Sequence, residues 1–78
     1  MRELFFHKTI EREGNDCQII KDAHVVEILS GEVVGYVATC STIYRGWMGF
    51  DTRSQSFVYD KDHLDEAIQF CEEFLKDY

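Results

Sequence analysis

The clearest pattern lies near the C-terminal end of the chain, where apolar residues recur at steps of three and four. They are Leu64, Ala67, Ile68, Cys71, Phe74, Leu75 and Tyr78. This spacing is the helical period and gives one apolar stripe. Asp62 is a favourable N-cap, and Asp65 and Glu66 add negative charge to the first turn, where the helix dipole favours it. The pattern predicts an amphipathic helix whose Ile68 and Phe74 are buried.

The preceding part of the chain consists of short apolar runs separated by turn residues, which is typical of antiparallel strands. We expect strands at residues 17–21, 24–30, 33–43 and 47–51, and residues 57–59 fit either a further short strand or an entry to the helix. Residues 3–11 carry apolar side chains on both parities together with good helix formers, so a strand and a short helix both fit there.

The turns between these runs are marked by residues that tolerate positive φ. Gly14-Asn15 and Gly31-Glu32 each predict a hairpin. Tyr44-Arg45-Gly46 is expected to turn or bulge the chain, and the polar residues 52–55 are expected to form a loop.

These elements predict an α+β fold in a single domain, residues 1–78. It is a small antiparallel β-meander of four to six strands with one C-terminal amphipathic helix packed on one face. A length of 78 residues fits one domain, and a content of 45% hydrophobic and 14% aromatic residues argues against a disordered chain. The other face of the sheet is only partly polar, which favours a binding surface there.

The charge balance narrows the possible partners. Fifteen acidic and eight basic residues give a formal net charge of −7. A field of this sign opposes binding to phosphate backbones and anionic lipid, and it favours a protein with a basic surface. No apolar run approaches the ~18 residues of a membrane span. We expect no membrane association and a monomer or homodimer.

Cysteine and histidine spacing gives no sign of catalytic or metal chemistry. Cys17, Cys40 and Cys71 are far apart and form no Cys-x-x-Cys pair, which predicts free thiols in a cytoplasmic protein. The sequence has no zinc-ligand spacing, nucleophile elbow or phosphate-binding loop. We therefore expect no enzyme activity, metal or other cofactor.

Two groups of residues are candidates for partner binding. The first is Tyr44, Arg45 and Trp47, because Trp, Tyr and Arg dominate protein interface hot spots. The alternatives are that Trp47 is the largest residue of the core, or that the three residues stack bases and hold phosphate in a nucleic-acid-binding domain.

The second group is acidic and lies on the predicted helix. Once the apolar stripe is buried, five carboxylates remain outside: Asp65, Glu66, Glu72, Glu73 and Asp77. Spaced carboxylates on a rigid helix can imitate a phosphate row and occupy a basic groove. The alternative is an ordinary solvated helix face.

By analogy of size and charge alone, the sequence favours a non-catalytic protein-binding module. The expected role is an inhibitor or adaptor acting on a basic, nucleic-acid-handling protein complex. Phage and mobile-element anti-CRISPR or anti-restriction proteins, including DNA mimics, are of this type. The alternatives are the nucleic-acid-binding domain and a homodimeric structural subunit.

Overall fold

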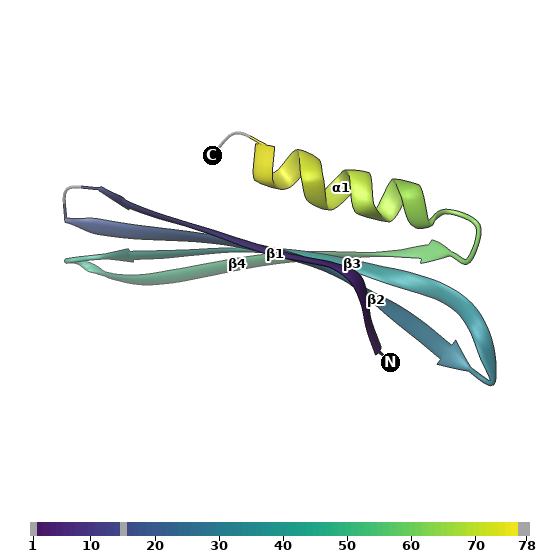
Figure 1. Ribbon diagram of the computed structural model, residues 1–78. Coiled ribbons are helices and arrows are strands. Elements are labelled where there is room, and N and C mark those ends of the chain that lie inside the picture. Colours follow the sequence, from purple (N-terminus) through teal and green to yellow (C-terminus); the bar gives the residue numbers. More distant parts are fainter. Residues whose placement is uncertain (1, 15, 77–78) are drawn as a thin grey trace.

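The fold is a sheet of four strands followed by one helix. The computed structural model describes the backbone of residues 2–14 and 16–76 and the side chains of residues 9–14 and 16–76. The elements are β1 (Arg2–Gly14), β2 (Cys17–Ser30), β3 (Glu32–Gly46), β4 (Gly49–Asp60) and α1 (Leu64–Lys76). Neighbouring strands pair antiparallel in the order β1-β2-β3-β4, and α1 lies across one face (Figure 1). The predicted α+β meander is confirmed.

The strands are longer than the sequence pattern predicted. The expected strands at residues 17–21 and 24–30 form one strand, β2, and residues 3–11 lie in β1 rather than in a helix. Residues 52–55 belong to β4 and are not a loop, because they pair with residues 40–43 of β3. Their polarity reflects exposed side chains on an edge strand, which remains compatible with ladder pairing.

The turns confirm two predicted hairpins and shift a third. Gly14 pairs with Cys17 across a two-residue turn in which Asp16 has a φ of 62°; Asn15 lies outside the described residues. Gly31, with a φ of 79°, stands at the apex between β2 and β3. The expected turn at residues 44–46 is wrong, because pairing continues to Gly46 and Gly49, and residues 47–48 make the turn.

The core lies between α1 and the face of the sheet that it covers. Its apolar members are mostly small: Ala23, Val25, Tyr36, Ala38, Cys40, Ala67, Cys71 and Leu75. Small side chains at the centre allow the helix and sheet to approach closely. Ile68 and Phe74 pack against this cluster as predicted but are only half-buried, because Ala67, Cys71 and Leu75 take the buried positions of the stripe. Glu27 is also buried, which the sequence pattern did not predict.

The start of α1 corrects the predicted cap. The helix begins at Leu64, and the Ala67 N–H donates to the His63 carbonyl at 3.2 Å. His63 therefore takes the position expected for Asp62. The reason is the preceding turn, in which the His63 N–H donates to the Asp60 carbonyl at 3.0 Å and delays the helix by one residue.

The helix is much shorter than the sheet. Its 13 residues span about 20 Å, whereas the longest dimension of the molecule is 47 Å. From the end of β4 the helix runs back over β2, β3 and β4 and ends before the sheet does (Figure 1). The end of the sheet with the β1–β2 and β3–β4 turns therefore projects beyond the helix.

Gly35 permits a close approach between β3 and β4. A Cβ at this position would lie 2.5 Å from the Tyr59 carbonyl oxygen, which is a backbone atom and cannot move without separating the strands. We expect Gly35→Ala to lower the free energy of unfolding by about 1–3 kcal/mol, as overpacking does. Chemical denaturation measures this loss. Gly46→Ala is the control, since its Cβ meets the movable Tyr44 ring, and an equal loss in both variants would contradict the prediction.

Candidate protein-binding surface at a hairpin tip

Two hairpin turns lie side by side at the end of the sheet that projects beyond α1. Gly14 pairs with Cys17, Cys17 with Gly46, and Gly46 with Gly49, so the four residues form one row across all four strands. Figure 1 shows both turns at this end. Within the described backbone, the turn between β3 and β4 therefore has no helix above it, and the neighbouring hairpin lies beside it (Figure 1).

Large apolar side chains project from the β3–β4 turn. Trp47 is 81% exposed and Met48 is 80% exposed, and the Tyr44 side chain is also exposed. These three residues are called the tip patch below. The interpretation of Trp47 as a core residue is therefore wrong, because the turn carries it past the end of the sheet, where the described residues leave it 81% exposed.

The local sequence explains why the turn holds its side chains in solvent. Glycine stands on both sides of Trp47 and Met48, and Gly49 has a φ of 149°, which favours glycine. The Tyr44 ring folds over Gly46, where a Cβ would come within 2.8 Å of a ring carbon. Because Gly46 has no side chain, the Tyr44 ring packs against the backbone at this position, and Trp47 stays exposed.

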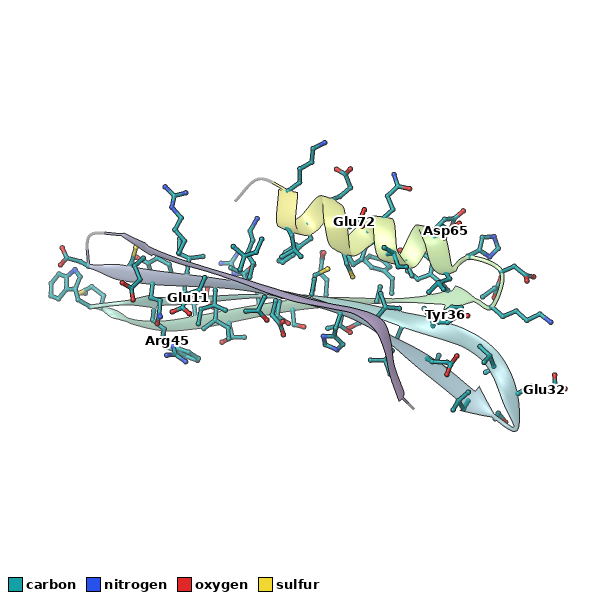
Figure 2. The ribbon with its side chains drawn as sticks, in the orientation of Figure 1. Glu11, Glu32, Tyr36, Arg45, Asp65 and Glu72 are labelled. Carbon is teal, nitrogen blue, oxygen red and sulfur yellow. The ribbon has the colours of Figure 1, made fainter. Side chains whose placement is uncertain are left out.

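Arg45 lies at the same tip but on the face of the sheet away from α1 (Figure 2). Its guanidinium carbon is 5.8 Å from the centre of the Phe50 ring, its cross-strand partner. Successive strand residues point to opposite faces, so Tyr44 faces the helix side. The structure therefore gathers Tyr44, Arg45 and Trp47 at one tip but spreads them over two faces, and they do not form one flat stacking platform.

The acidic candidates form a separate surface on α1. Asp65, Glu66, Glu72 and Glu73 are exposed, and Figure 2 shows the positions of Asp65 and Glu72 along the helix. Asp77 lies outside the described residues. Because α1 begins at the end of the sheet far from the tip, its first-turn carboxylates are distant from the tip patch. The predicted partner-binding residues thus divide into two surfaces.

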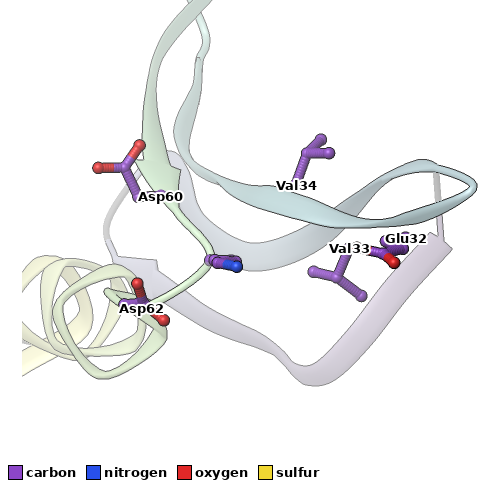
Figure 3. A pocket seen from close by; sticks show the side chains of 6 residues that line it. Glu32, Val33, Val34, Asp60 and Asp62 are labelled. Carbon is purple, nitrogen blue, oxygen red and sulfur yellow. The ribbon is translucent and has the colours of Figure 1, made fainter.

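A pocket of about 390 Å³ lies at the opposite end of the molecule, between the β2–β3 turn and the loop that leads into α1 (Figure 3). It is lined by Glu32, Val33, Val34, Asp60, Lys61 and Asp62. Among the side chains of residues 9–14 and 16–76, no three His, Cys, Asp or Glu are grouped as a metal site requires. The pocket has no nucleophile beside a base.

Two of the cysteine thiols are buried in the core. Cys40 and Cys71 are free, and their sulfur atoms are 3.8 Å apart between β3 and α1. Burial, with a smaller effect of Cys71, raises the pKa of the Cys40 thiol to about 12, and burial likewise raises the pKa of Cys71. Both groups stay protonated near neutral pH, and a protonated thiol is a poor nucleophile.

These thiols make the free energy of unfolding depend on pH in the alkaline range. The unfolded chain ionises Cys40 near a pKa of 9.0, whereas the folded chain holds its proton up to a pKa of about 12. The unfolded state thus binds fewer protons in this range, and we expect the free energy of unfolding to fall as pH rises from 9 towards 12. Denaturation at a series of pH values measures it. An unchanged pH slope in Cys40→Ala would contradict the assignment to this thiol.

Comparison with known proteins gave no match to a family model, a curated protein or a solved structure. In the described part of the chain, no helix combines the length and apolar character that crossing a membrane requires.

Proposed function

We propose that this chain is a non-catalytic protein-binding module of the inhibitor or adaptor type, which inserts the tip patch into an apolar pocket of a partner protein. The observation that carries the proposal is the exposure of Trp47 and Met48, 81% and 80%, on a turn without a core role. Burying a large apolar side chain contributes about 1.5–3 kcal/mol, which the free chain does not gain here. This free energy is gained when the pocket of a partner protein covers the tip patch.

The charge of the chain favours a basic partner. A net charge of −7 raises the rate of encounter with a positive surface, and the exposed carboxylates of α1 present a row of negative groups to it. Proteins that handle nucleic acid have such surfaces. Inhibition of a nucleic-acid-handling complex, as by anti-CRISPR or anti-restriction proteins, is therefore the form of the proposal that size and charge support.

Capture of the partner by the immobilised chain tests the proposal. The wild type is compared with Trp47→Ala and with the control Val34→Ala, which shortens another exposed apolar side chain at the far end of the sheet. We expect the wild type and the control to retain the same protein and Trp47→Ala to lose it. Equal retention by all three contradicts a role for the tip.

A mobility-shift assay with single-stranded and double-stranded probes tests the competing function. Binding of nucleic acid by the wild type, lost in Trp47→Ala, would replace the proposal with a nucleic-acid-binding domain.

A further inference from the structure

The face of the sheet away from α1 is covered by no element of the described chain (Figure 1). It is called the open face below. The strand register assigns its side chains, because residues paired across strands point to the same side. The open face extends along the full length of the sheet. On the opposite face, α1 covers only part of that length (Figure 1).

Two apolar rows cross the open face. Val26, Val37 and Val58 form the first, and Val58 is 75% exposed. Ile20 and Ile43 form the second, which ends at Thr52 on β4. Phe50, 66% exposed, lies in the next row towards the tip, where it pairs with Arg45. Cross-strand rows of β-branched residues are typical of a face that packs against another sheet. Along the strand direction, the two apolar rows lie on either side of the middle of the sheet.

The polar rows between them satisfy much of their own hydrogen bonding. The hydroxyl oxygens of Thr39 and Ser56 are 2.9 Å apart, and those of Ser41 and Ser54 are 3.1 Å apart. On the β1 side, Thr9 donates to an Asp22 carboxylate oxygen at 2.6 Å. A buried polar group is costly mainly when it lacks a partner. These pairs reduce the cost of covering the middle of the open face.

We propose that the open face binds a second copy of this chain and forms a two-fold dimer with two packed sheets. A two-fold interface uses the same patch on both copies. The two apolar rows flank a polar centre. A two-fold axis in the plane of the interface and parallel to the strands places each apolar row on the same row of the other copy. An axis perpendicular to the strands places each apolar row on the other one. The hydroxyl pairs of one copy then meet those of the other, where their remaining donors and acceptors can pair.

The area of the face fits this occupant. The molecule extends 47 × 20 Å along its two longer axes, so its footprint of roughly 900 Å² is the upper bound for the open face. A standard stable interface buries about 800 Å² per partner, which fits within that bound. The Glu11 side chain on the outer strand β1 is exposed and falls at the rim. Trp47 and Met48 extend past the end of the sheet, so each copy keeps its tip patch accessible.

Sedimentation analysis over a concentration series tests the dimer. We expect the wild type to reach twice the chain mass. Val58→Glu places a charge on the open face at an exposed position of β4, where the monomer tolerates it, and should weaken dimerisation by about 30-fold or more. Ser54→Glu is a second variant on the same face. The control Gln55→Glu adds the same charge to the opposite face of the same strand and should dimerise as the wild type does.

Several results overturn the proposal. They are a wild type that stays monomeric throughout the series, a dimer that both folded open-face variants retain, and a control that dissociates as they do; circular dichroism verifies folding.

The dependence on salt distinguishes this dimer from the proposed complex with a basic partner. Screening reduces the repulsion between two chains of charge −7, so salt should strengthen the dimer and weaken the other complex. Trp47→Ala should leave the dimer intact, so each proposal can fail separately.

Discussion

Replacing Trp47 with alanine is expected to weaken partner binding by about 30-fold or more, the effect of losing a hot-spot residue worth at least ~2 kcal/mol. The side chain is 81% exposed in the free chain, so its contacts form only in the complex. For the same reason the free energy of unfolding should change by no more than about 0.5 kcal/mol. Surface binding kinetics with the captured partner should show faster dissociation and a nearly unchanged association rate.

The carboxylates of α1 provide the matched comparison. Neutralising Glu72 and Glu73 with glutamine keeps the shape of the helix face and removes two exposed negative charges. If this face meets a basic partner at the rim of the interface, association should slow at low salt and become less dependent on salt. A wild-type association rate in this double variant would contradict phosphate imitation. Wild-type dissociation by folded Trp47→Ala would place the anchor elsewhere.

Replacing Leu75 with alanine is expected to lower the free energy of unfolding by about 2–5 kcal/mol. Leu75 is 5% exposed near the end of α1 and packs in the cluster that joins the helix to the sheet. Removing its methyl groups leaves a cavity that the neighbouring strands fill only partly. A loss of this size is a large share of the 5–15 kcal/mol typical of a folded domain. Urea denaturation should show a lower midpoint with an unchanged slope.

Phe74 supplies the control for this position. Its ring is half-buried, with the Lys21 ammonium 5.1 Å from its centre, and its carbonyl oxygen accepts a hydrogen bond from Lys21 at 2.9 Å. Phe74→Ala removes the ring but keeps the hydrogen bond to the carbonyl, so it should be less destabilising than Leu75→Ala. A loss of only a few tenths of a kcal/mol in Leu75→Ala would show that α1 is not docked on the sheet.

The candidate site shows why burial and position are hard to read from residue type alone. Trp47 is the largest apolar residue of the chain, and its composition fits a core as well as an interface. Its exposure depends on where the third turn falls, and the turn depends on pairing that continues to Gly46 and Gly49. The polarity of residues 52–55 predicts a loop for a related reason, since side-chain polarity does not report the backbone pairing that β3 supplies.

The sequence alone determined the features that depend on local periodicity. The three-and-four spacing from Leu64 onward specified the helix and its apolar stripe, and the glycine turns specified two hairpins of the meander, because these patterns act within a few residues. Only the tertiary structure decided that Ala67, Cys71 and Leu75 take the centre of the stripe, that one face of the sheet stays open, and that Trp47 projects at the tip. These outcomes depend on which surface lies opposite each side chain, and that surface comes from residues distant in the chain.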